Sequence, residues 1–133
     1  MSRSSLRAAL HGFIVTAAVT ALPAAIDPAF AAGDPVAGKA VFQSICSNCH
    51  SDKPGVNKTG PSLFGLVGRK TGSVEGYNYS PQNKAANLTW DDATLDKYLQ
   101  APRATIPGTK MTYAGLKDDT KRENLIAYLN TLK

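Results

Sequence analysis

The clearest pattern of apolar residues lies at the C-terminal end of the chain. The i, i+3, i+4 and i+7 positions of one helix face are occupied by Leu125, Tyr128, Leu129 and Leu132. The six residues before this run are all charged or polar. The pattern predicts an amphipathic helix that begins at about Asp119 and includes Leu132.

A second amphipathic helix is predicted to begin near residue 35. Asp34 followed by Pro35 is typical of a helix start, with a carboxylate as N-cap and proline at the first helical position. The apolar residues near one face of this helix are Val36, Ala40, Val41 and Ile45, with Gly38 and Phe42 beside them. A glycine inside a helix costs about 1 kcal/mol relative to alanine. A close crossing with another helix would offset that cost, and a merely tolerated glycine is the alternative.

The segment from residue 51 to residue 80 shows no sustained helix or strand period. It is rich in Gly, Pro, Asn, Lys and Ser, and so long a stretch is unusual in a compact domain unless it wraps around something. A second loop, residues 106–111, precedes the C-terminal helix.

Two shorter helices are predicted between these loops. A serine-proline pair begins one of them, over residues 81–86. Thr89, with Asp92 three residues on, starts the other, which must end before Pro102. No segment has a convincing strand pattern, so the fold class we expect is an all-α, loop-rich single domain.

The first 31 residues have the pattern of a secretory signal peptide. Two arginines lie near the start, an apolar stretch covers residues 8–22, and an A-x-A cleavage motif ends at Ala31. A retained membrane anchor is the alternative, but the apolar run is short and is followed by Pro23. We therefore expect residues 1–31 to be cleaved, and residues 32–133 to form one domain without stable membrane insertion.

The charge of the chain is moderately positive. The formal net charge is +5, and loss of the two arginines and one aspartate of the signal leaves +4. Such a charge suits docking on an acidic protein surface by long-range steering. No basic run or aromatic-interleaved patch indicates nucleic-acid binding. We expect a monomer that docks transiently and electrostatically on its partners.

The segment Cys46-Ser47-Asn48-Cys49-His50 matches the C-x-x-C-H signature of covalent haem attachment. On one helical turn, two thiols separated by two residues can reach both vinyl groups on one edge of the porphyrin, and the next side chain can reach the metal. Beyond residue 31, His50 is the only histidine and Met111 is the only methionine.

Three other uses of the cysteine pair are less consistent with the sequence. Structural zinc typically needs four ligands in two separated pairs, and residues 32–133 contain one such cluster. A thioredoxin-like site normally begins a helix that follows a strand, whereas this pair lies near the end of a helix. A disulfide suits an exported protein, but it leaves His50 and the long loops unexplained.

The composition also constrains what the iron can do. Met111 lies in a loop with no helix face to fill, so an iron-ligand role explains it better than core packing does. Thioether ligation raises the reduction potential, and a six-coordinate iron leaves little room for a substrate. The ligand set therefore favours a carrier over a peroxidase or a gas sensor.

Longer segments carry a family resemblance. They are Lys58-Thr59-Gly60-Pro61, Gly65-Leu66, Gly68-Arg69-Lys70-Thr71-Gly72, Trp90, Tyr98-Leu99, Ile106-Pro107-Gly108-Thr109-Lys110-Met111, Ala114-Gly115 and Leu125-Ile126-Ala127-Tyr128-Leu129. In these segments the chain resembles class I c-type cytochromes, that is, mitochondrial cytochrome c and its close bacterial periplasmic relatives. The resemblance implies the class I cytochrome c fold, in which crossed N- and C-terminal helices, short helices and loops surround one covalently bound haem c. At the crossing, it implies that Gly38 and Phe42 pack against Leu125 and Tyr128.

The resemblance also implies roles for individual residues. Cys46 and Cys49 would form the haem thioethers, and His50 and Met111 would be the axial ligands. Pro61 would accept a hydrogen bond from the ring of His50. The remaining residues would surround the inner haem propionate and the distal pocket: Arg69, Tyr79, Asn83, Trp90, Tyr98 and Thr109.

The chain departs from the mitochondrial pattern at several positions. Ile45 stands where the family usually carries lysine, and Asn57 stands where histidine is common. The cations that remain as candidates for docking on a partner are Lys39, Lys58, Arg103, Lys110 and Lys117. The identity of the partner is therefore left open.

We expect a soluble one-electron carrier of the bacterial periplasm that cycles between Fe(II) and Fe(III). Its partners would be redox proteins of the membrane electron-transfer chain, with a quinol-oxidising complex as donor and a terminal oxidase or a photosynthetic reaction centre as acceptor. One alternative is a dedicated electron acceptor of a periplasmic dehydrogenase. Another is a haem enzyme with peroxidase activity, in which Met111 detaches from the iron.

Overall fold

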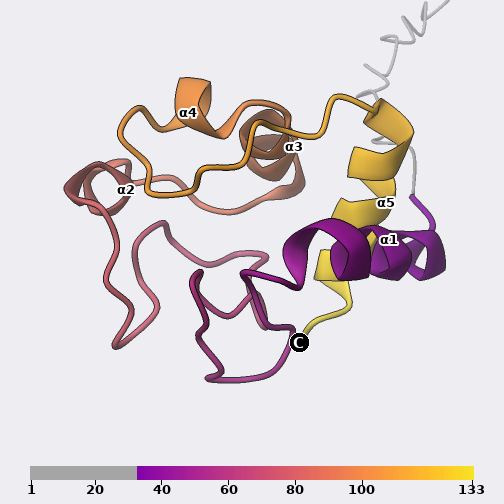
Figure 1. Ribbon diagram of the computed structural model, residues 1–133, viewed down its shortest axis with the longest axis horizontal. Coiled ribbons are helices and arrows are strands. Elements are labelled where there is room, and N and C mark those ends of the chain that lie inside the picture. The colour runs from indigo at the N-terminus through magenta and orange to yellow at the C-terminus, as the bar shows by residue number, and fades with distance from the viewer. Residues whose placement is uncertain (1–32) are drawn as a thin grey trace, which may run out of the picture.

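The structure, a computed structural model, describes residues 33–133, so the expected signal peptide lies outside the described residues. Its helical elements in chain order (Figure 1) are α1 (Pro35–Val41), the π-helical turn η1 (Phe42–Cys46), α2 (Pro81–Ala85), α3 (Asp92–Gln100), α4 (Pro102–Thr105) and α5 (Asp119–Asn130). Residues 33–133 contain no β-strand, only one isolated antiparallel bridge between Lys70 and Thr89. The all-α, loop-rich prediction is therefore confirmed. Within the same range, no helix is both long enough and apolar enough to cross a membrane.

Helices α1 and α5, from opposite ends of the described chain, cross in close contact (Figure 1). A Cβ atom added to Gly38 of α1 would lie 1.9 Å from the carbonyl oxygen of Asn124 in α5. Next to this point the rings of Phe42 and Tyr128 pack with their centroids 5.5 Å apart. The glycine is required here because any side chain would collide with the backbone of α5.

The predicted apolar face of α1 is partly wrong. Val36 is 78% exposed, and Ala40 is also exposed, whereas the buried residues are Gly38 and Phe42. The close crossing at Gly38 fixes the rotation of the helix about its axis. From Phe42 onward the chain is π-helical, which changes the residue spacing of the exposed and buried sides. Neither effect is visible in hydrophobic spacing alone.

The start of α3 also differs from the prediction. Asp91 is the N-cap, and its side chain accepts a hydrogen bond of 2.7 Å from the backbone N–H of Thr94. Thr89 instead forms the bridge with Lys70, and the backbone N–H of the next residue, Trp90, donates to the carbonyl oxygen of Arg69 over 2.9 Å, so the chain is still paired with another segment where the predicted helix would begin. The helix ends before Pro102 as predicted, but the short helix α4 that begins at this proline was not predicted.

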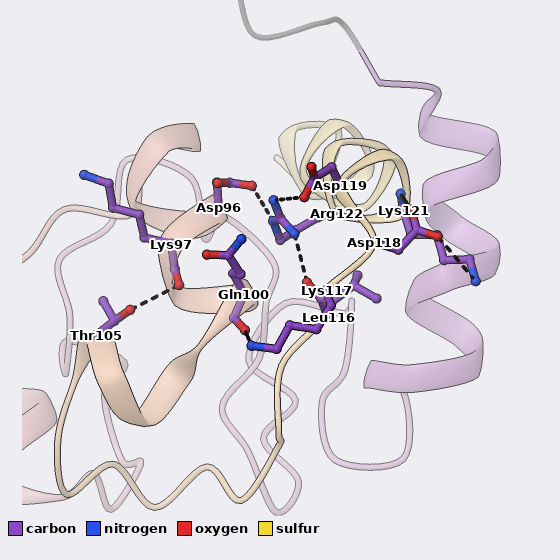
Figure 2. Close-up of polar contacts among 10 residues, drawn as sticks. All are labelled: Asp96, Lys97, Gln100, Thr105, Leu116, Lys117, Asp118, Asp119, Lys121 and Arg122. Carbon is purple, nitrogen blue, oxygen red and sulfur yellow. Dashed lines mark hydrogen bonds and ion pairs between the residues drawn. The ribbon is translucent and has the colours of Figure 1, made fainter.

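A buried arginine fastens α5 to α3 (Figure 2). The side chain of Arg122 is 5% exposed and pairs with Asp96 of α3 and with Asp119, and its Nη1 donates to the carbonyl oxygen of Leu116 over 2.9 Å. Asp96 is the less exposed of the two carboxylates, so its removal would leave the buried guanidinium with only an exposed acidic partner, a destabilising change. The network therefore holds the C-terminal helix at a fixed position.

The hydrophobic core lies between the terminal helices and α3. It contains Leu95 and Leu99 of α3 and three buried residues of the predicted apolar face of α5, Leu125, Tyr128 and Leu129. Leu132 lies beyond the end of α5 and is partly buried. This core forms one side of the cavity described next.

Candidate haem site

A cavity of about 480 Å³ lies between the long loops and the helices, a volume within the usual range for bound small molecules and cofactors. All eleven residues that the sequence predicted for the cofactor line this one cavity. They are Cys46, Cys49, His50, Pro61, Arg69, Tyr79, Asn83, Trp90, Tyr98, Thr109 and Met111. The loop segment 51–80 supplies several of its walls, as expected for a loop that wraps around a bound group.

The cysteines and His50 reach the cavity from a tight turn at the end of η1. The backbone N–H groups of Cys49 and His50 both donate to the carbonyl oxygen of Cys46, over 3.0 and 2.8 Å. The two cysteines are not joined to each other by a disulfide. Burial, followed by the nearby Cys49, raises the pKa of the Cys46 thiol to about 11. A redox-active thiol needs a lowered pKa, so these surroundings do not favour the thioredoxin-like alternative.

His50 is held as a neutral imidazole with one nitrogen free. Its Nδ1 lies 2.8 Å from the carbonyl oxygen of Pro61, and because a carbonyl can only accept, Nδ1 carries the proton. Burial is the main cause that lowers the pKa of His50; the charge of Lys58 also lowers it, and the Pro61 bond opposes both. The Nε2 lone pair is therefore available to a metal.

Gly60 packs against the face of this imidazole. A Cβ atom added to Gly60 would lie 2.3 Å from Cε1 of His50, so no larger residue fits without displacing the ring. The backbone N–H of Gly60 donates to the carbonyl oxygen of Cys49 over 2.7 Å. The turn of residues 46–50 and the segment Gly60-Pro61 thus hold the ring between them.

Met111 comes from a different wall of the cavity, the loop between α4 and α5. Its backbone N–H donates to Oγ1 of Thr109 over 3.3 Å, and this hydroxyl also shares a hydrogen bond of 3.1 Å with the phenol of Tyr98. Burial raises the pKa of Tyr98, against the opposing effect of the bond to Thr109, so the phenol stays protonated. Met111 as a whole is only partly buried, in a loop tied down through one threonine.

The cavity also contains buried polar groups whose hydrogen bonds are incomplete. Arg69 donates from Nη2 to Ser62 over 2.9 Å and from Nη1 to Phe64 over 3.1 Å, both at backbone carbonyls. Its Nε, and Oδ1 of the buried Asn83, have no partner among residues 33–133. Buried polar groups are nearly always paired. A guanidinium N–H and an amide, which can present either end, suit a bound group with carboxylates such as haem propionates.

The comparison with protein families is decisive. The model of the family described as Cytochrome c matches residues 35–133. The chain belongs to the cytochrome c family. It is accordingly an electron-transport haem protein with one covalently bound haem c, and its cysteines at 46 and 49 fit the attachment motif of the family.

Named members of this cytochrome c family are similar over nearly their full length. A cytochrome c2 of Rhodopila globiformis is 52% identical over 101 residues, which cover 76% of this chain and 95% of the relative. A cytochrome c of Euglena viridis is 48% identical, over 76% of this chain and 99% of the relative. A cytochrome c-550 of Nitrobacter winogradskyi is 50% identical, over 74% and 90%. The class I cytochrome c fold inferred from the resemblance is thereby confirmed.

Several residues that line the cavity were missed by the sequence analysis. The polar and aromatic ones include Tyr77, Ser80 and Tyr113. The rings of Tyr77 and Tyr79 pack edge to face with centroids 4.7 Å apart. Tyr77 and Tyr79 are two residues apart, and in extended chain this spacing places both side chains on the same side. That spacing is the signal from which Tyr77 could have been predicted.

The five candidate docking cations do not gather at the cavity, since only Lys110 lines it. Lys39 on α1 and Arg103 on α4 are exposed. The ammonium groups of the other three donate to backbone carbonyls: Lys58 to Ser47 over 2.6 Å, Lys110 to Asn78 over 2.8 Å and Lys117 to Gln100 over 2.5 Å. These three lysines therefore also join segments of the fold.

Proposed function

We propose that this chain is a one-electron carrier in which His50 and Met111 bind the two axial positions of the haem iron. The observation that carries the proposal is that His50 and Met111, from separate segments, line one cavity together with Cys46 and Cys49. The proton on Nδ1 of His50, directed at Pro61, leaves Nε2 as the metal-binding atom.

The chain's own residues would set the properties of that iron. The bound haem supplies an iron that exchanges one electron between Fe(II) and Fe(III). The hydrogen bond from His50 to Pro61 makes the imidazole a stronger donor, which favours Fe(III), whereas the thioether of Met111 favours Fe(II). Thr109 and Tyr98 hold the methionine loop in place, and Arg69, Tyr79, Asn83 and Trp90 would surround the inner propionate.

The partners we propose are membrane-bound redox complexes that dock through acidic surfaces. The donor would be a quinol-oxidising complex, and the acceptor a terminal oxidase or a photosynthetic reaction centre. The positive net charge and the similarity to proteins named cytochrome c2 support this role, and the signal-like pattern of residues 1–31 supports a bacterial periplasm. The exposed cations Lys39 and Arg103 would contribute to docking together with Lys58, Lys110 and Lys117.

Axial ligation is tested by the absorption spectrum of the ferric holoprotein. Methionine on ferric haem gives a weak far-red band, which should be present in the wild type and absent from Met111→Ala. Thr112→Val, a change at the neighbouring exposed residue, is the control and should retain the band. A wild type without the band that rapidly turns over peroxide would instead support the haem-enzyme alternative.

Docking is tested by the salt dependence of electron-transfer association rates. Exposed charges are screened over about 8 Å at physiological ionic strength, so the rate with an acidic partner complex should fall steeply as salt rises. Rates that do not change with salt would contradict electrostatic docking, while leaving the axial ligation unaffected.

A further inference from the structure

Tyr77 contacts the segment that carries the hydrogen-bond acceptor of His50. Its phenol donates to the backbone carbonyl of Thr59 over 2.6 Å, across 18 residues of sequence. Two residues after Thr59, the carbonyl of Pro61 lies 2.8 Å from Nδ1 of His50. Tyr77 therefore touches the short backbone segment through which His50 is held, without touching the axial-ligand atoms.

This segment has little freedom to move without disturbing the ring. Between Thr59 and Pro61, Gly60 lies so close to His50 that an added Cβ would be 2.3 to 2.8 Å from three atoms of the imidazole. Its N–H is bonded to the carbonyl of Cys49 over 2.7 Å. Because a hydrogen bond weakens steeply with misalignment, small displacements here would change the bond between His50 and Pro61.

Two side chains clamp the segment from different directions. Lys58, next to Thr59, donates from Nζ to the carbonyl of Ser47 over 2.6 Å, which joins the segment to the turn between the cysteines. Tyr77 joins it to the loop of residues 77–80, in which its ring packs edge to face on Tyr79. Tyr77 is therefore the contact that couples the Tyr79 loop to the histidine side of the site.

We infer that Tyr77 is a positioning residue for His50. Its bond to Thr59 keeps the Pro61 carbonyl aligned with the Nδ1–H of the imidazole. The aligned bond makes His50 a stronger donor and lowers the reduction potential. This inference rests on the proposed function, in which His50 binds the iron.

The test compares the holoprotein with Tyr77→Phe, which keeps the ring and its packing on Tyr79 and removes only the hydroxyl. The ferrous state is diamagnetic, so hydrogen exchange of the His50 Nδ1–H can be followed by NMR. We expect exchange to become about fivefold faster, the factor that one ordinary hydrogen bond contributes to a local opening equilibrium. The reduction potential should rise, because a less strongly held imidazole favours Fe(II).

Tyr113→Phe is the matched control. Tyr113 lines the same cavity, and its hydroxyl has no hydrogen bond to any of residues 33–133. This change should leave the exchange rate within twofold of the wild type. Lys58→Met is a second variant, which removes the other clamp on the segment and should also speed exchange.

Three results would overturn the inference or its basis. Unchanged exchange and potential in Tyr77→Phe would overturn the positioning role, and so would equal acceleration in Tyr77→Phe and Tyr113→Phe. In the wild type, ring protons of a haem-bound histidine are shifted strongly upfield. If those of His50 are not, the proposed axial ligation itself fails, a result distinct from failure of the positioning role.

Discussion

His50 and Met111, which line the haem cavity from separate segments, are held by very different contacts. On the histidine side, the Nδ1 of His50 lies 2.8 Å from a backbone carbonyl, and Gly60 packs against its ring while bonding to Cys49 over 2.7 Å. On the methionine side, Met111 lies in a loop whose nearest polar anchor is the hydroxyl of Thr109, at 3.3 Å from the methionine N–H. Of the two proposed iron ligands, His50 is thus held by several close contacts within the fold, whereas Met111 is presented by a loop.

The difference suggests that one proposed ligand is held rigidly while the other can be adjusted. With Cys46 and Cys49 bound to the haem as proposed, the tightly packed ring of His50 would have no alternative position. A loop tied through one threonine can shift at small cost, so in the proposed ligation the bond from Met111 would be the one that sequence changes or added ligands alter first. The predictions below test this asymmetry, from the largest expected effect to the smallest.

Removing the histidine should have the largest effect. In His50→Ala, the thioethers would still tether the haem, but the nitrogen ligand and the group packed against Gly60 are lost. We expect the low-spin spectrum to disappear and the yield of folded holoprotein to fall well below that of Met111→Ala. A six-coordinate low-spin spectrum that persists in His50→Ala would show that His50 does not ligate the iron.

Adding a methyl group beside the imidazole of His50 should have the next largest effect. In Gly60→Ala, the new methyl group would overlap the imidazole of His50, so we expect the free energy of unfolding to fall by about 1 to 3 kcal/mol and the reduction potential to change. Denaturant unfolding and redox titration measure both quantities.

The control for this change is Gly55→Ala. Gly55 has a φ of +68° and open space around it, so alanine there meets only backbone strain of about 1 kcal/mol. The reduction potential of Gly55→Ala should equal that of the wild type. Equal potentials in both variants would mean that the packing of Gly60 on His50 is not important to the iron.

On the methionine side, Thr109→Val removes the hydroxyl that joins Met111 to Tyr98. Loss of these bonds should lower the free energy of unfolding by about 1 kcal/mol and speed displacement of Met111 by added imidazole about fivefold. Stopped-flow spectroscopy measures the displacement. If Thr112→Val, one residue beyond Met111, speeds it as much, the anchoring role assigned to Thr109 is wrong.

The last expected effect is absent near neutral pH and appears only in alkali, as a pH dependence on the histidine side. Tyr128 of α5 donates to Asp52 over 2.8 Å, and burial, followed by this partner, raises the pKa of Tyr128 from 10.0 to about 12. The phenol therefore ionises more readily in the unfolded chain, so its contribution to stability is complete below about pH 10 and is lost as pH rises toward 12.

The measurement for Tyr128 is the free energy of unfolding at pH 9 and at pH 11.5, in the wild type and in Tyr128→Phe. The wild type should lose more stability over this interval than the variant, because phenylalanine has no proton to release. Identical losses would show that the bond between Tyr128 and Asp52 does not contribute to alkaline stability.

Much of the site could be predicted from sequence because its chemistry needs rare residues. The chain beyond residue 31 has one histidine, one methionine and one cysteine pair, so few ligand sets were available. The glycine at position 38 left a close helix crossing and a merely tolerated glycine both open, and only the family resemblance favoured the crossing of the terminal helices. These features depend on residue identity rather than on packing.

Features set by tertiary contacts could not be predicted in the same way. The exposure of Val36 follows from the rotation that the crossing imposes on α1, and the loss of Thr89 as a cap follows from its bridge to Lys70. The bond between Tyr77 and Thr59 joins two irregular loops, where no periodicity relates one residue to the other. In each case the partner is distant in sequence and contributes backbone atoms, which carry no residue-specific signal.

The central claim, that His50 and Met111 are opposite ligands of one iron, is tested most directly by proton NMR of the ferrous holoprotein labelled at methionine methyl groups. A methyl group bound to the iron lies over the porphyrin ring, so the Met111 methyl signal should be shifted far upfield, to negative chemical shift. It should vanish in Met111→Ala. A Met111 methyl signal at the ordinary position of a methionine side chain would contradict the claim.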